Sequence, residues 1–137
     1  MQSPTKPSRP RSVTALGLTQ IVLGIFSFFG GFVHIFLGIG SIVTFSGSYA
    51  ILGTVASLLG TSLVVFGVLF LIAGIATIGA YRWAWTYGVG VALAGLVVGV
   101  ISLGLGTVGA VPGVALAVGI LWMLRLASVR SFLASSG

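Results

Sequence analysis

The sequence predicts an all-α integral membrane protein, a bundle of four transmembrane helices that run up-down-up-down with tight, left-handed packing along glycines. Of its 137 residues, 58% are hydrophobic and only 4% are charged, whereas an ordinary soluble domain is about 45–50% apolar and about 25% charged. Four apolar segments each exceed the roughly 20 residues that cross a hydrocarbon core of about 30 Å. The links between them are short, so consecutive helices are expected to lie side by side and antiparallel.

The four predicted helices form one transmembrane domain over residues 13–133. They cover about residues 13–43, 50–80, 83–105 and 111–133, and lipid forces such segments to close their backbone hydrogen bonds as helices. The first segment is longer than the apolar region of about 7–15 residues in a secretory signal peptide, so we interpret it as a membrane helix. Residues 1–12 are predicted to be a disordered basic tail and residues 134–137 a C-terminal tail.

The charges predict the orientation of the bundle. The chain has six Lys and Arg residues and neither Asp nor Glu. With four crossings, all six basic residues fall on one side of the membrane: Lys6, Arg9, Arg11, Arg82, Arg125 and Arg130. The positive-inside rule makes that side cytoplasmic. We therefore expect an integral protein of the cell membrane with both termini on the cytoplasmic side. Basic residues that flank apolar segments favour membrane lipids over nucleic acid as the partner.

Aromatic residues gather beside these charges. Trp83 and Trp85 follow Arg82, and Trp122 precedes Arg125. The pattern is typical of anchors at the headgroup level, and we prefer this interpretation to an aromatic binding site. Residues 123–137 are open to two interpretations, a short interfacial helix or the frayed end of the fourth span.

Glycines repeat every seven residues in the first two segments. A strict seven-residue repeat favours left-handed supercoiling, and small residues let apolar helices approach closely in lipid. The first two segments also share this pattern at an offset of 36 residues, which either a duplication or a common packing need would produce. Whether the stripes pack internally or against another subunit is left open by the sequence. The predicted helix-packing residues are Gly17, Gly24, Gly31, Gly38, Gly53, Gly60, Gly67, Gly74, Gly88, Gly95 and Gly99.

The residues of acid–base and metal chemistry are almost entirely missing. The chain has neither carboxylate side chains nor cysteines and a single histidine, so we predict that it is not an enzyme and holds no metal or cofactor. His34 lies on the small and polar stripe of the first segment. It could ligate haem iron together with a second subunit, but a hydrogen bond between helices is the preferred interpretation, for His34 and for Gln20 alike.

Residues 68–85, VLFLIAGIATIGAYRWAW, carry a resemblance to small prokaryotic four-helix membrane proteins of unknown function. Those families have a glycine-rich helix, a short turn with Arg, and Trp-Ala at the start of the next helix. The matching residues here are Gly74, Gly79, Arg82, Trp83 and Ala84. The families usually continue with another basic residue, where this chain has Trp85.

Residues 15–40 resemble the first helix of the CD20-like four-span family. The likeness is carried by Leu16-Gly17, Gln20-Ile21, Gly24, His34 and Leu37-Gly38. The resemblance implies four spans, cytoplasmic termini, and assembly with copies of the same chain or with other membrane proteins.

These observations lead to three functional hypotheses. The first is a non-catalytic structural or accessory subunit of a larger membrane complex, with a respiratory or other membrane-bound oxidoreductase as one host. The second is a self-assembling small channel or solute carrier. The third is a homo-oligomeric membrane scaffold. The expected partners are therefore lipids and either other integral membrane subunits or copies of the chain itself.

Overall fold

A computed structural model describes residues 9–104 and 110–135, and these residues form five α-helices and no strand. The helices are α1 (Arg11–Thr44), α2 (Ser48–Ile78), α3 (Ala84–Gly104), α4 (Val111–Arg125) and α5 (Ala127–Ser135). The all-helical prediction is thus confirmed. Most of the predicted basic tail, including Lys6, and most of the link after residue 105 lie outside the described residues.

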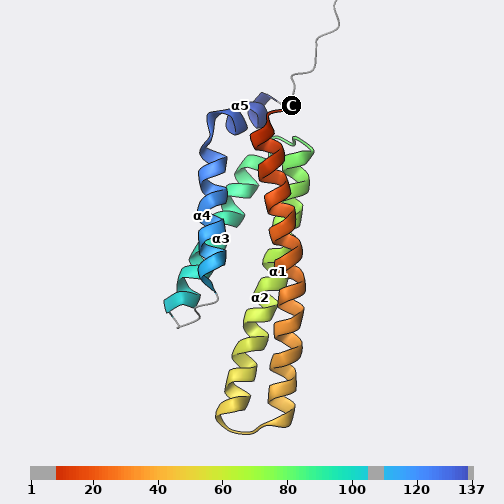
Figure 1. Cartoon of the computed structure of the whole chain (residues 1–137), viewed down its shortest axis with the longest axis vertical. Helices are drawn as coiled ribbons and strands as arrows, with labels where there is room; N and C mark the ends of the chain where they lie inside the picture. The colour runs from red at the N-terminus through yellow and green to blue at the C-terminus, as the bar shows by residue number, and fades with distance from the viewer. Residues whose placement is uncertain (1–8, 105–109, 136–137) are drawn as a thin grey trace, which may run out of the picture.

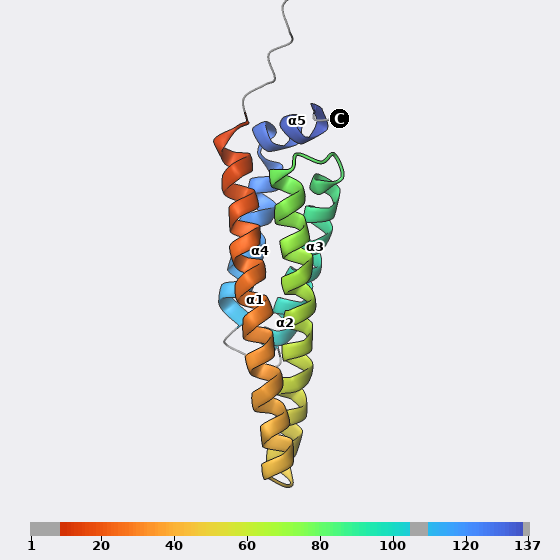
Figure 2. The same ribbon diagram turned by 90° about the vertical axis from the view of Figure 1, so that its right-hand side faces the viewer.

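Two helical hairpins of unequal length make up the molecule. α1 and α2 lie side by side over their whole length, and the shorter α3–α4 hairpin covers only the part of them nearer to α5 (Figure 1). At about 1.5 Å per residue, the 34 residues of α1 extend about 51 Å, whereas the 21 residues of α3 extend about 32 Å. The far part of the α1–α2 hairpin therefore projects beyond α3 and α4, as Figure 2 also shows.

The helix lengths and compositions indicate an integral membrane protein. Among the described residues, α1, α2 and α3 are each long and apolar enough to cross a membrane. α4 and α5 pass the same test only together, and they are bent by 64° at the break between them. The count is therefore three candidate spans, or four if the bent pair is one span.

The fourth predicted segment differs from the structure. The fourth span was expected over residues 111–133, with residues 123–137 left open as its frayed end or as a short interfacial helix. α4 ends at Arg125, Leu126 takes an extended conformation with φ −60° and ψ 129°, and a separate short helix, α5, follows. α5 then turns across the end of the bundle (Figure 1). The turn buries Val129 and Leu133 in the same apolar cluster as Val13 and Leu16, which a straight continuation would leave uncovered.

The other helix boundaries lie close to the predicted ones. α1 begins at Arg11, so the last two residues of the predicted tail are helical, and α3 begins one residue later than expected. Differences of this size are common at helix ends. The start of α1, the turn from α2 to α3, the end of α4 and α5 meet at one end of the molecule. This basic end carries all the arginines, each with an exposed side chain: Arg9, Arg11, Arg82, Arg125 and Arg130.

Candidate functional site

The heptad glycines of α1 and α2 face one another in a continuous contact that we call the glycine seam. They meet in reverse order, Gly17 opposite Gly74, Gly24 opposite Gly67, Gly31 opposite Gly60 and Gly38 opposite Gly53. All eight are buried. A Cβ added at any of them would lie only 2.5–3.2 Å from the carbonyl oxygen of the facing glycine. The seam is therefore a contact of backbone against backbone.

This arrangement answers a question that the sequence leaves open. The stripes of α1 and α2 pack against each other inside one chain, so neither stripe is free to meet another subunit. Close approach lets the two backbones gain dispersion contacts and weak Cα–H···O bonds. Because an antiparallel pair needs the same spacing on both helices, packing alone accounts for the glycine pattern that the two segments share.

The predicted glycines of α3 have a different environment. A Cβ at Gly88 would lie 3.3 Å from Nε2 of Gln20, one at Gly95 would lie 3.6 Å from the ring of Phe70, and one at Gly99 would lie 2.6 Å from Cγ2 of Val114. These neighbours are side chains, which can move, rather than backbone. The seam therefore does not continue onto α3.

Gln20 joins α1 to α2 beside the seam. Its side chain is fully buried, and its Oε1 accepts a hydrogen bond from Oγ1 of Thr77 at 3.0 Å. Nε2 is buried as well and has no hydrogen-bond partner within the described part of the chain. The amide thus links two helices, as the sequence suggested, but leaves the NH₂ group of Gln20 unsatisfied.

His34 does not make the predicted bond between helices. Its ring is exposed, and Nδ1 bonds to the carbonyl oxygen of Gly30 in the same helix at 2.8 Å. The seam does not by itself explain this, because Gln20 lies two heptads earlier on the same stripe and is buried and bonded to Thr77 of α2. His34 differs in its place along the hairpin: it lies at the level of Ser102, near the end of α3, beside a cavity. Within the described residues, no group of three or more His, Cys, Asp or Glu side chains could hold a metal ion.

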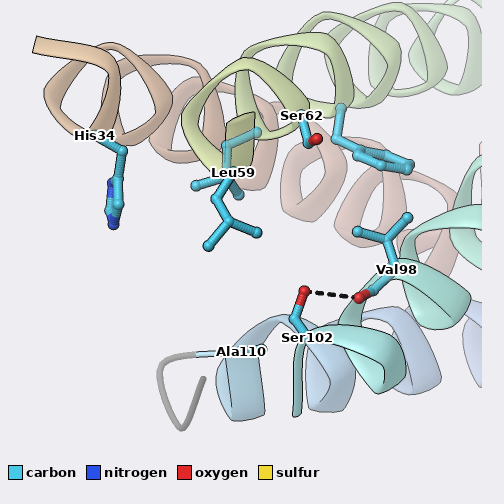
Figure 3. A pocket seen from close by; sticks show the side chains of 8 residues that line it. His34, Leu59, Ser62, Val98, Ser102 and Ala110 are labelled. Atoms are coloured by element: carbon cyan, nitrogen blue, oxygen red, sulfur yellow. Dashed lines mark hydrogen bonds between the residues drawn. The ribbon is translucent and has the colours of Figure 1, made fainter. Parts of the chain in front are cut away.

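A cavity of about 270 Å³ lies beside His34, between the two hairpins (Figure 3). We call it the His34 cavity. Figure 3 shows His34 at one end of the lining, Leu59 and Ser62 on one side, and Val98 and Ser102 on the other. It is lined by His34, Leu59, Ser62, Leu63, Phe66, Val98, Ser102 and Ala110.

The aromatic residues of the basic end have separate environments. Trp85 is half-buried, its Nε1 donates to the carbonyl oxygen of Leu124 at 3.0 Å, and the guanidinium of Arg130 lies 5.4 Å from its ring centre. Trp85 therefore clamps the bend between α4 and α5. Trp83 and Trp122 are 48% and 66% exposed, which is compatible with the predicted interface anchors.

The contact of Trp85 with the bend between α4 and α5 was not predicted, because Trp85 was grouped with Trp83 and Trp122 as an anchor at the headgroup level. The available signal was the run after Arg125, where Val129, Phe132 and Leu133 recur at spacings of three and four among serines. Such spacing is typical of a short amphipathic helix.

Comparison with known proteins adds no relative to this description: neither a protein-family model, nor a curated protein, nor a solved structure matches the chain.

Proposed function

We propose that this chain is a non-catalytic structural subunit of a larger membrane complex, and that the projecting part of the α1–α2 hairpin contacts a neighbouring subunit. In this proposal α4 completes a fourth span, the packing is left-handed, and the basic end with both termini lies in the cytoplasm. The supporting observation is the apolar surface of the hairpin beyond α3 and α4. We call that part, residues 35–58, the distal hairpin.

The length of the hairpin supports the proposal. Transmembrane helices tilt by at most about 40°, and at that tilt a core of about 30 Å holds about 39 Å of helix. α1, with its 34 residues, extends about 51 Å, so part of it has to leave the hydrocarbon core. If the basic end sits at the cytoplasmic surface, the part that leaves is the distal hairpin.

The composition of the distal hairpin is unsuited to water. Its large apolar side chains are exposed in the single chain, whereas its seam glycines, Gly38 and Gly53, are buried against each other. Exposed apolar area in water costs about 25 cal/mol per Å², so a covering partner would stabilise it. The most exposed of these side chains are Phe36 at 71%, Leu37 at 65%, Val43 at 81%, Ile51 at 67% and Leu58 at 64%.

Photo-crosslinking at two matched positions of α1 tests the proposal. Phe36 lies in the distal hairpin and Phe26 lies ten residues earlier, and the two are almost equally exposed, at 71% and 73%. Benzoylphenylalanine would replace each in turn in native membranes. We expect a protein adduct from position 36 and mainly lipid adducts from position 26.

Mass spectrometry of the adduct, together with a native gel after gentle solubilisation, would identify the partner. A second polypeptide at fixed stoichiometry supports the proposal. An adduct between copies of this chain would instead favour the homo-oligomeric scaffold, and lipid adducts alone at position 36 would overturn the proposal.

A further inference from the structure

The polar side chains of the His34 cavity offer hydrogen-bond acceptors and no donors. Its polar side chains are His34, Ser62 and Ser102, among five apolar residues. The hydroxyl of Ser62 donates to the carbonyl oxygen of Leu58 at 3.1 Å, and that of Ser102 donates to Val98 at 2.8 Å. Each hydroxyl has a single proton, so both oxygens face the cavity with only acceptor lone pairs left.

The imidazole of His34 also offers the cavity only a hydrogen-bond acceptor. Its Nδ1 lies 2.8 Å from the carbonyl oxygen of Gly30, and a carbonyl only accepts, so Nδ1 must carry the proton. In the neutral ring the other nitrogen, Nε2, is then a bare acceptor. Every polar side chain that lines the cavity therefore offers an acceptor and has no proton left to donate.

We propose that the His34 cavity binds a membrane-soluble alcohol or phenol, whose hydroxyl group donates a hydrogen bond to Nε2 of His34 or to a serine oxygen. Five apolar residues, Phe66 among them, receive the body of the ligand. The volume of about 270 Å³ is just below the range of about 300–1,000 Å³ for drug-sized ligands, so it suits one ring or a short length of chain. A hydroxyl compound is favoured over a ketone or quinone, because the oxygens of the latter only accept, and a serine could donate to them only by giving up its bond to the helix carbonyl.

The depth of the cavity fits such an amphipathic ligand. His34 lies 23 positions after Arg11 in α1, which at about 1.5 Å per residue is about 35 Å from the basic end. That distance is close to the thickness of the hydrocarbon core, about 30 Å. The cavity then lies near the opposite membrane surface, where a hydroxyl group can sit while its apolar body remains among lipid chains.

Nitrogen NMR of the single histidine provides a direct test. Because the sequence contains one His, ¹⁵N-histidine labelling of the full chain in lipid nanodiscs reports on His34 alone. In alkaline buffer, where an imidazole is neutral, the spectrum should show the Nδ1–H tautomer. An Nε2–H tautomer would give the cavity a donor and overturn the proposal.

Two pairs of ligands then separate the hydroxyl from the body that carries it. The probes are para-hexylphenol and decanol, each compared with its own methyl ether, which keeps the shape and loses the donor. We expect the hydroxyl compound to shift the Nε2 resonance and to bind roughly threefold to tenfold more tightly than its ether, as one hydrogen bond predicts. The phenol pair and the alcohol pair together show whether a ring or a chain is preferred.

Two neighbouring hydroxyl residues provide the matched variants. Ser62 lines the cavity, whereas Thr61 does not and bonds its own helix at Ser57. Ser62→Ala should reduce the preference for phenol over ether, and Thr61→Ala should leave it unchanged. Equal binding of hydroxyl compound and ether to the unmodified chain, or an equal loss of preference in both variants, would refute the proposed site. An unchanged preference in Ser62→Ala requires that the Nε2 resonance of His34 shift, and the absence of that shift as well would also refute it.

Discussion

The two hairpins of this protein are built by different means. In the α1–α2 hairpin, eight buried glycines bring backbone against backbone along the whole length of both helices. In the α3–α4 hairpin, Gly99 meets the side chain of Val114, and Gly95 meets rings of α2 rather than of α4. A backbone contact cannot relax around an added atom, whereas a side-chain contact can repack. The first hairpin should therefore tolerate far less change than the second.

The contrast also explains why the α1–α2 hairpin projects beyond the rest of the molecule and why the chain bends between α4 and α5. A continuous seam holds α1 and α2 together without help from other elements, so the hairpin can project beyond them. The shorter pair depends on its surroundings: α4 has only 15 residues and is completed by α5, which is held by Trp85 and the cluster around Val129 and Leu133. The first hairpin thus provides rigidity, and the second depends on contacts at the basic end.

The largest expected effect comes from one methyl group in the middle of the seam. In Gly31→Ala the new Cβ would meet the carbonyl oxygen of Gly60 at 2.6 Å and the backbone nitrogen of Val64 at 2.7 Å. Both neighbours are backbone, so the helices have to separate, and we expect a loss of about 3 kcal/mol in the free energy of unfolding. Reversible unfolding in mixed detergent micelles, followed by circular dichroism, measures it.

The preceding residue is the control. A Cβ at Gly30 meets nothing within 4 Å, so Gly30→Ala should leave packing intact and stabilise the helix by about 0.5–1 kcal/mol. The two substitutions add the same atoms one position apart. If both had the same sign, the seam would not be the contact described.

The seam was predictable from the sequence in part. The seven-residue spacing of Gly17, Gly24 and Gly31 identified the packing face of the first segment, because small residues at that period have few other uses in a membrane helix. The spacing did not identify the partner: glycine stripes look the same whether they face their own chain or another. The bond of His34 was misjudged for another reason: Gln20 has the same position in the heptad and does reach α2, but the sequence does not show that the space beside His34 is a cavity.

The second largest loss of stability is expected from a substitution of Trp85, which clamps the bend between α4 and α5 at the basic end. Trp85→Phe removes the donor to the carbonyl oxygen of Leu124 and weakens the contact with Arg130, which lies 5.4 Å from the ring. A lost hydrogen bond and a weakened cation–π contact together should cost about 1–2 kcal/mol. Hydrogen exchange measured by mass spectrometry should show faster exchange in α5 and unchanged exchange along the seam.

Trp83→Phe is the matched control for the clamp. Trp83 is 48% exposed and stacks with Tyr81 at a ring separation of 6.0 Å, so its replacement should leave α5 protected. Equal exchange in the two variants would mean that Trp85 does not hold the bend.

The smallest effect on stability is expected at the turn that joins the two hairpins. There a substitution should stabilise the protein, whereas Gly31→Ala and Trp85→Phe should destabilise it. α2 ends with paired hydrogen bonds from Ala80 to Thr77 and from Tyr81 to Ala76, and Ala80 has φ 56°. This arrangement is one that glycine adopts freely, whereas an L-residue is disfavoured there by about 1–2 kcal/mol. The greater freedom of glycine in the unfolded chain offsets part of the gain, so Ala80→Gly should stabilise the protein by about 0.5–1 kcal/mol in the same unfolding assay. Because the turn belongs to neither hairpin, the substitution should leave the rates of hydrogen exchange in the seam and in α5 unchanged relative to each other. A loss of stability would mean that the methyl group of Ala80 contributes more than its conformation costs, and that the joint between the hairpins is itself a packed contact.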